Sequence, residues 1–264
     1  MKTILLVGST PDALAEELIQ RISAIARESI EARGMFNVAV SGGSMPKILA
    51  GWADAESMDF SKCKIWFADE RCVPLDCDDS NYKAWKALFR SAGIPPANIV
   101  AVATDLPPEQ AAADYETKIK EAFSDARDED APQSLPCFDT LLLGVGPDGH
   151  TCSLFPGHVL LEEKEKWVAH IEDSPKPPPE RVTLTYPLLN NARNVMFIGT
   201  GKGKASLVPN LICVSDGALS SAGASSPYPA ARVTVGEGRE LLWCVDQAAA
   251  SECPREMLNL ATTC

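Results

Sequence analysis

Short apolar runs alternate with helical patterns along most of this chain, and no other feature of the sequence restricts its fold as strongly. The runs with the composition of β-strands are residues 3–8, 36–42, 64–70, 98–103, 138–144, 167–173, 194–201 and 241–246. Helical periodicity is found at residues 11–32, from about Pro46, and at 80–91, 107–124 and 247–260. Strands that are apolar throughout need cover on both faces. We therefore predict a doubly wound, Rossmann-like α/β fold, with a mostly parallel sheet and helices on both faces.

Three connecting segments have unusual compositions. Residues 125–134 are charged and then turn-rich, which indicates a surface loop. Residues 172–181 are rich in proline and predict a stiff, extended connector. Residues 215–231 are rich in Ser, Gly and Ala and predict a mobile loop. None of them marks a domain boundary, so we predict a single domain over residues 1–264.

In an open parallel sheet the active site lies where the carboxyl ends of the strands meet. The stretch "AVSGGSMPK" (39–47) ends one predicted strand and begins a helix. Gly42 and Gly43 let the backbone approach an anion closely, and Ser44 adds a hydroxyl donor beside the N–H groups of the helix start. This pattern indicates a phosphate-binding loop, although Ser44 as the N-cap of an ordinary turn explains it equally well. The spacing and the lysine of an ATP-binding loop are absent.

The stretch "WFADER" (66–71) ends another apolar strand with three charged residues, Asp69, Glu70 and Arg71. Charges at such a position are costly to bury unless they are paired. One interpretation is a surface turn with an internal ion pair. The other is that the planar guanidinium of Arg71 binds a phosphate with parallel hydrogen bonds, while Asp69 or Glu70 holds the arginine in place.

The stretch "GVGPDGH" (144–150) has the glycine spacing of a dinucleotide-binding turn. Such a turn needs a helix immediately after the glycines, and Pro156 and Gly157 prevent a helix of more than about two turns here. The carboxylate of Asp148 would also repel a pyrophosphate. The glycine spacing is therefore weak support for a dinucleotide site.

Three other interpretations of this stretch remain. A zinc site made from His150, Cys152 and His158 matches no common ligand spacing. An acid–base pair is better supported, because an imidazole with a pKa of about 6.5 accepts a proton from water near neutral pH, and Asp148 fixes its tautomer. The surrounding glycines would then offer free N–H groups to a developing oxyanion. A histidine held structurally in a turn is the alternative.

The charge balance restricts the partners. The formal net charge is −12, so the chain repels nucleic acid and anionic membranes. An anionic substrate would need a local group of cations, and Arg181, Lys202 and Lys204 follow the proline-rich connector or a glycine turn where they could supply it. Solvent-exposed lysines with no role are the alternative.

The beginning of the chain resembles a signal peptide only superficially. Its apolar stretch runs only from Ile4 to Val7, and acidic residues follow. No apolar run reaches the length of about 18 residues that a membrane span requires. The nine cysteines form no C-x-x-C pair, which favours reduced thiols. We therefore expect a cytoplasmic protein.

Four blocks of this sequence together carry a family resemblance. They are "VAVSGGSMPKIL", "WFADERCVPLDCDDSNY", "LLLGVGPDGHTCSLFPGH" and "RVTLTYPLLNNARNVMFIGTGKGKA", in this order within residues 36–205. The combination resembles the 6-phosphogluconolactonase family of the glucosamine-6-phosphate isomerase-like superfamily. Four blocks in register are far more specific than any one of them.

The resemblance implies hydrolysis of 6-phospho-D-glucono-1,5-lactone to 6-phosphogluconate in the pentose phosphate pathway, without a metal or an organic cofactor. It implies that His150 is the catalytic base and that Asp148 supports it. It implies a binding site for the 6-phosphate and the sugar made from Gly42, Gly43, Ser44, Asp69, Arg71, Arg181 and Lys204. Lys202 fits the family pattern less well than Lys204. We expect a monomer whose partner is this small-molecule lactone.

Two alternatives share the fold. Glucosamine-6-phosphate deaminases also have the glycine-rich loop and a D-G-H triplet, but their second block is similar to D-E-Y and their triplet leads to N-E-P. The corresponding segments here are "ADER" and "HTCSLFPG", which favour the lactonase. A non-catalytic sugar-phosphate sensor ranks third, because such regulators carry a DNA-binding helix-turn-helix segment that this acidic chain is not expected to contain.

Overall fold

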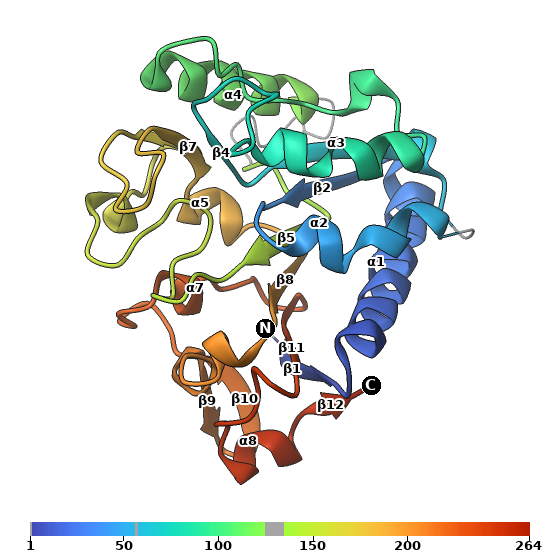
Figure 1. Cartoon of the computed structure of the whole chain (residues 1–264), viewed down its shortest axis with the longest axis vertical. Helices are drawn as coiled ribbons and strands as arrows, with labels where there is room; N and C mark the ends of the chain where they lie inside the picture. The colour runs from blue at the N-terminus through green and yellow to red at the C-terminus, as the bar shows by residue number, and fades with distance from the viewer. Residues whose placement is uncertain (1, 56–57, 125–134) are drawn as a thin grey trace.

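A seven-stranded sheet organises the computed structural model, which describes residues 2–55, 58–124 and 135–264 (Figure 1). Every neighbouring pair of strands in it is parallel, and the order is β12–β1–β11–β8–β5–β2–β3. The strands are β1 Lys2–Gly8, β2 Phe36–Val40, β3 Cys63–Phe67, β5 Thr140–Gly144, β8 Asn194–Gly199, β11 Glu240–Asp246 and β12 Thr262–Thr263. The predicted parallel α/β fold is confirmed.

Helices cover both faces of this sheet and create two separate apolar cores. The helices on the first face are α1 Pro11–Arg33, α2 Met45–Ile48 and α3 Asn81–Ser91. Those on the second are α4 Pro108–Ala122, α5 Tyr186–Leu189, α6 Val208–Leu211, α7 Pro229–Arg232 and α8 Arg255–Asn259. Figure 1 shows α1 on one side of the strands and α5 and α7 on the other. Successive side chains of a strand point to opposite faces, so Leu241 and Trp243 belong to the second core and Leu242 to the first.

Local sequence signals fix the ends of the longest helix, α1. The hydroxyl of Thr10 caps its first turn, and Pro11 occupies its first position, where the missing N–H costs nothing. Gly34 ends the helix in the left-handed conformation, with a φ of 80°. Leu14 and Leu18 lie on the buried stripe of the helix. None of the described helices is long and apolar enough to cross a membrane.

The connections of β2 and β5 leave the sheet in opposite directions. These strands are hydrogen-bonded neighbours, but the chain continues from β2 outwards to β3 and from β5 inwards to β8. The segment after β2 packs on the first face, and the segment after β5 packs on the second. Such a divergence leaves a crevice at the carboxyl ends of the two strands, which is where ligands bind in open α/β sheets.

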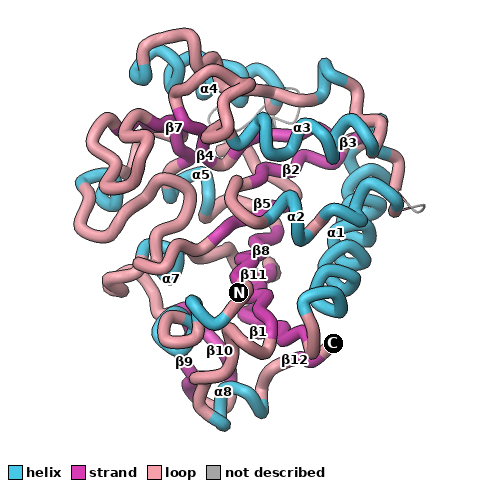
Figure 2. Tube along the Cα trace, viewed as in Figure 1, coloured by secondary structure: helices cyan, strands magenta, loops and turns pink. Residues whose placement is uncertain are grey.

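A smaller antiparallel sheet stands beside this crevice. It has the order β4–β7–β6, with bounds β4 Asp69–Arg71, β6 Val168–Ile171 and β7 Arg181–Leu184. The apolar run predicted as one strand at 64–70 is thus divided, because the chain leaves the main sheet after Phe67. Figure 2 shows that the segments around β7 and α7 are mostly loop. Short 3-10 helices complete the described structure: η1 Ala50–Asp54, η2 Phe60–Lys62, η3 Pro96–Asn98, η5 Val159–Glu162 and η6 Lys202–Lys204.

Some of the predicted elements are wrong. Residues 98–103 form no strand: Ile99 makes only an isolated bridge to Ile65, and the run is apolar because part of it packs into the core. The predicted strand at 167–173 exists as β6, but in the antiparallel sheet. Residues 247–260 are largely turns before the short helix α8.

Residues 215–231 are predicted to be a mobile loop, and the prediction of a loop is wrong for part of this stretch. They contribute to the hairpin of β9 (Ile212–Ser215) and β10 (Ala218–Ser221) and contain most of α7. Backbone hydrogen bonds to distant segments order this part of the chain, and its composition does not reveal them. The surface loop predicted at 125–134 lies outside the described residues.

A buried carboxylate joins β4 to α3. Glu70 is 1% exposed and accepts hydrogen bonds from the N–H groups of Arg71, Asn81 and Tyr82 at 2.7–2.8 Å and from the hydroxyl of Ser80 at 3.2 Å. Burial raises the pKa of Glu70, although the three backbone hydrogen bonds oppose this rise. The carboxylate therefore fixes Arg71 relative to the first turn of α3.

We expect Glu70→Gln to destabilise the protein by about 1–3 kcal/mol, because the amide NH₂ would face donors that now bond to a carboxylate oxygen. The free energy of unfolding measured in urea by circular dichroism tests this. Glu121→Gln, an exposed change on α4, is the control and should alter the stability by less than about 0.5 kcal/mol. If Glu70→Gln left the protein as stable as before, the proposed role of the carboxylate would be contradicted.

Candidate active site

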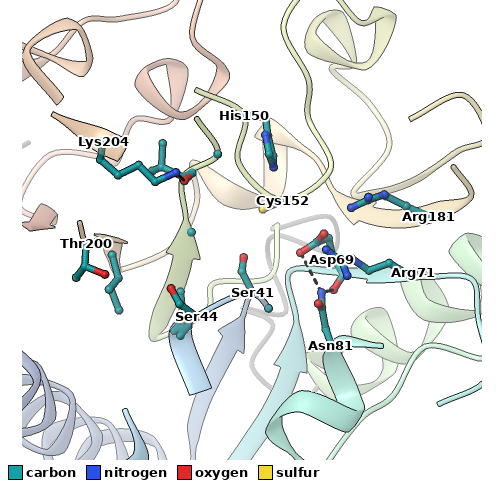
Figure 3. Close-up of a pocket in the computed structure, with 17 residues that line it drawn as sticks. Ser41, Ser44, Asp69, Arg71, Asn81, His150, Cys152, Arg181, Thr200 and Lys204 are labelled. Atoms are coloured by element: carbon teal, nitrogen blue, oxygen red, sulfur yellow. Dashed lines mark hydrogen bonds between the residues drawn. The ribbon is translucent and has the colours of Figure 1, made fainter. Parts of the chain in front are cut away.

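A pocket of about 270 Å³ lies in the crevice at the carboxyl ends of β2, β5 and β8 (Figure 3). The smaller sheet closes one of its sides with residues of β4 and β7. The sequence-predicted residues that line it are Gly42, Gly43, Ser44, Asp69, Arg71, His150, Arg181 and Lys204. Figure 3 shows His150 between Lys204 on one side of the pocket and the two arginines on the other. Residues up to 162 positions apart in the sequence, from 42 to 204, thus meet at one edge of the sheet.

The loop after β5 folds back on itself to present His150. The N–H of Gly146 donates to the carbonyl of His150 at 2.8 Å, and the N–H of Gly149 donates to the carbonyl of Gly146 at 3.0 Å. A side chain at position 146 would not fit, because a Cβ there would lie 2.0 Å from the imidazole ring. The expectation that these glycines offer free N–H groups to an oxyanion is therefore wrong, since the turn itself uses both.

Asp148 and Phe155 fix the imidazole of His150. Its Nδ1 lies 2.5 Å from Oδ1 of Asp148, and the ring of Phe155 packs against it with the centroids 4.7 Å apart. The same Asp148 oxygen accepts a hydrogen bond from Nζ of Lys176 at 3.0 Å. No hydrogen bond among the described residues uses Nε2 of His150. An ionised Asp148 accepts only, so Nδ1 carries the proton and Nε2 has a free lone pair.

The surroundings favour a neutral imidazole. Burial lowers the pKa of His150 below its ordinary value; the hydrogen bond and charge of Asp148 oppose this effect, and the charge of Lys176 adds to it. Burial alone would raise the pKa of Asp148, but its hydrogen bonds with His150 and Lys176 outweigh this and lower the pKa to about 2. At neutral pH the pair is therefore a carboxylate beside an imidazole that can accept a proton.

Two arginines stand side by side across the small sheet. Arg71 of β4 and Arg181 of β7 are direct partners in the antiparallel ladder, and Arg181 is only 3% exposed. Burial lowers the pKa of Arg181, and the positive charge of Arg71 contributes to this lowering. The Nε of Arg71 is buried and has no hydrogen-bond partner among the described residues. Two adjacent cations, one buried and one half-buried with an unused donor, are suited to an anionic ligand.

Asp69 also lines the pocket near Arg181, and two side chains hold its carboxylate. Its carboxylate accepts hydrogen bonds from the hydroxyl of Ser153 at 3.0 Å and from the amide of Asn81 at 3.4 Å. The same Asn81 amide donates to the backbone carbonyl of Asp69 at 2.8 Å. Asn81 also limits the loop after β2, because a Cβ at Gly42 would lie 1.8 Å from its side-chain oxygen.

The loop after β2 offers unused donors. No hydrogen bond in the described part of the chain uses the N–H groups of Gly42, Gly43 or Ser44. Gly43 has a φ of 73°, which favours glycine. Ser44 is the N-cap of α2, but its hydroxyl makes no capping hydrogen bond, so the interpretation as an ordinary cap does not account for it. Because α2 spans only four residues, the amides and the hydroxyl, rather than a helix dipole, make this loop suitable for an anion.

Of the two lysines in the turn after β8, only Lys204 reaches the pocket. Its Nζ donates to the carbonyl of Val145 at 2.6 Å, and burial together with the charge of Lys176 lowers its pKa. Lys202 is exposed and is not among the residues that line the pocket. The carboxylate of Asp246 fixes the turn by accepting from the N–H of Gly201.

The interpretation as a zinc site has no geometric support. Among residues 2–55, 58–124 and 135–264, no three His, Cys, Asp or Glu side chains are grouped as a metal site requires. Nε2 of His158 contacts Asp173 at 3.0 Å, and its Nδ1 accepts from the N–H of Leu160. Cys152 lines the pocket but is largely buried, and burial raises its pKa.

Sequence reasoning missed two residues of this site, Lys176 and Asn81. Lys176 lies in the proline-rich connector, where an isolated lysine carries no motif. Asn81 is part of the "DDSNY" stretch that supports the family resemblance, and that stretch was its only signal in the sequence.

Comparisons with known proteins identify the family of this chain. The sequence matches the family described as "Glucosamine-6-phosphate isomerases/6-phosphogluconolactonase" over residues 9–243. The chain belongs to this family. A 6-phosphogluconolactonase of Rattus norvegicus is 42% identical over 251 residues, which covers 92% of this chain and 91% of the relative. That of Homo sapiens is 43% identical over 225 residues, with 83% and 81% covered.

Other members of the family extend the comparison. A probable 6-phosphogluconolactonase of Oryza sativa subsp. indica is 40% identical over 253 residues, covering 94% of this chain and 75% of the relative, and its name describes it as chloroplastic. Among solved structures, the 6-phosphogluconolactonase of Trypanosoma cruzi gives a TM-score of 0.76 at 28% identity, with 95% of this chain and 96% of that chain covered. The enzyme of Thermotoga maritima gives 0.75 at 28% identity, with 93% and 100% covered.

We expect Asp148→Asn to lower the pKa of His150 further, because it removes the negative charge that opposes burial and Lys176. An NMR titration of the His Cε1–H signals measures this pKa directly. Asp173→Asn is the matched control, since it changes the partner of His158 and should leave the titration of His150 unchanged. A pKa of His150 that is unchanged or higher in Asp148→Asn would show that the carboxylate does not control the charge of the imidazole.

Proposed function

We propose that this chain is a 6-phosphogluconolactonase that hydrolyses 6-phospho-D-glucono-1,5-lactone to 6-phosphogluconate, with His150 as general base. The observation that carries the proposal is the largely buried His150, which lines the pocket with Nδ1 held by Asp148 and Nε2 free. The lactonases of Rattus norvegicus and Homo sapiens support the choice of reaction within the family.

In the proposed mechanism, Nε2 of His150 removes a proton from a water molecule as its oxygen attacks the lactone carbonyl carbon. The tetrahedral intermediate carries an oxyanion, which collapses with cleavage of the bond to the ring oxygen. The imidazolium returns its proton to that oxygen, and the product is an open-chain carboxylic acid that ionises. Asp148 stabilises the imidazolium in the intervening state. Since the N–H groups of Gly146 and Gly149 are already bonded within the turn, they are not the donors that stabilise this oxyanion.

The 6-phosphate of the substrate is proposed to bind between Arg71, Lys204 and the loop of Gly42, Gly43 and Ser44. The unpartnered Nε of Arg71 and the unused loop amides support this assignment. Arg181 and Asp69 line the same pocket, and Arg181 adds a second positive charge beside Arg71. Binding at a phosphate remote from the reacting carbon positions the lactone carbonyl against His150.

We also propose that residues 1–264 form one domain and act as a monomer. The main sheet contains strands from both ends of the described chain, and every residue assigned to the site comes from one copy. Nothing in the proposed chemistry requires a second subunit.

We expect His150→Ala to lower kcat by about 10²–10⁴-fold, because the water then lacks its base. Hydrolysis of freshly prepared lactone by the purified protein tests this, and circular dichroism checks the fold. His170→Gln in β6 is the control and should keep normal turnover. Normal turnover by His150→Ala would overturn the mechanism, and release of ammonia from glucosamine-6-phosphate by the unchanged protein would favour the deaminase alternative.

Arg71→Ala should weaken inhibition by 6-phosphogluconate at least about tenfold and leave the weaker inhibition by gluconate nearly unchanged. Arg71→Lys, which keeps the charge but loses the planar fork, should lie between. Arg90→Ala on the exposed face of α3 is the control for the loss of one positive charge. Equal losses for the phosphorylated and unphosphorylated compounds would exclude Arg71 as a phosphate ligand.

A further inference from the structure

Lys176 occupies a position that the family resemblance did not indicate. Its Nζ lies 3.0 Å from Oδ1 of Asp148 and 3.2 Å from Nδ1 of His150. Its side chain is 36% exposed, and it is not among the residues that line the pocket. The ammonium group therefore contacts the acid–base pair without lining the pocket itself.

The backbone around Lys176 is held on both sides. The guanidinium of Arg181 donates to the carbonyls of Lys176, Pro177 and Pro178 at 2.9–3.1 Å. The hydroxyl of Ser174 donates to the carbonyl of Lys176 at 2.8 Å and accepts from its N–H at 3.2 Å. These contacts fix the backbone from which the side chain of Lys176 extends to Asp148.

Hydrogen-bond chemistry restricts what the ammonium group does there. An ammonium has donors and no acceptor, so it cannot accept the proton of Nδ1. Asp148 Oδ1 is thus the shared acceptor of both Lys176 and His150. With a neutral imidazole the three groups have no net charge, whereas a protonated imidazole would place a second cation beside Lys176.

The other charges near His150 do not replace this effect. The titratable and charged groups that face the ring or line its pocket are Asp148, Lys176, Asp69, Arg71, Cys152, Arg181 and Lys204. Among the described cations, Lys176 alone is within hydrogen-bond distance of the ring. The two carboxylates favour the imidazolium, and Lys176 is the nearest charge that opposes them.

We propose that Lys176 is a positioning residue, whose ammonium group orients Asp148 against Nδ1 and keeps the imidazole of His150 neutral so that Nε2 remains available as a base. The proposal rests on the proposed role of His150. The proposal also gives Arg181 a second role. Its guanidinium lines the pocket and, at the same time, fixes the backbone of Lys176.

The test compares Lys176→Met, which keeps the length of the side chain and removes its charge, with Lys176→Arg, which keeps the charge. Lys164→Met, an exposed lysine between η5 and β6, is the matched control. NMR titration of the His150 signal in the substrate-free protein is the first readout. We expect the pKa of His150 in Lys176→Met to be higher than in the unchanged protein by about 1. In Lys176→Arg, which keeps the positive charge, the pKa of His150 should lie close to that of the unchanged protein.

The second readout is the pH profile of kcat/KM. In Lys176→Met the acid limb should move to higher pH by the same amount as the pKa of His150, so that kcat/KM below the limb falls about tenfold for a rise of about 1 in that pKa. KM should change much less than kcat. An unchanged His150 titration in folded Lys176→Met would overturn the role of Lys176, whatever its activity. If the pKa of His150 rose but the acid limb of kcat/KM did not move, the effect of Lys176 on His150 would be supported. The same result would refute His150 as the catalytic base.

Discussion

The divergence of two neighbouring strands is the constraint on which the rest of this structure depends. The parallel ladder aligns the carboxyl ends of β2, β5 and β8 at one edge of the sheet. Because the chain leaves β2 and β5 toward opposite faces, no connection in the described part of the chain covers the space between them. Three segments border that space: the loop of Gly42, Gly43 and Ser44 after β2, the loop that carries His150 after β5, and the turn that carries Lys204 after β8. The small antiparallel sheet then adds its two arginines from the side.

The pocket is rich in positive charge, although the molecule as a whole is negative. The chain has a formal net charge of −12, yet Arg71, Arg181 and Lys204 all line the pocket. Like charges in one pocket repel one another, and here each is fixed by backbone carbonyls: Arg71 by Asp79, Arg181 by the proline-rich connector and Lys204 by Val145. An anionic substrate would offset these positive charges. The same surroundings favour a neutral His150 beside an ionised Asp148, which is the charge state that the proposed base catalysis needs.

Sequence reasoning succeeded where local chemistry dictates structure. The apolar strands, the helix over residues 11–32 and the glycine-rich turn around His150 were each identifiable from neighbouring residues. Sequence reasoning failed where contacts between distant parts of the chain determine the secondary structure or the hydrogen bonds. Residues 98–103 have the composition of a strand but find no continuous partner among the described residues. Residues 215–231 look mobile but form β10 and α7. The amides of Gly146 and Gly149 were expected to be free, although the loop that needs these glycines also uses their N–H groups.

The sequence by itself determined the class of fold, the family and the residue types of the site, because periodicity and local motifs are properties of adjacent residues. Only the tertiary structure decided which of these residues meet. It selected Lys204 over Lys202, paired Arg71 with Arg181 across a ladder, and brought Lys176 from the proline-rich connector to Asp148. The physical reason is that a charge acts over a few ångströms of space, whatever its separation along the chain, and the packing of the two sheets sets those distances.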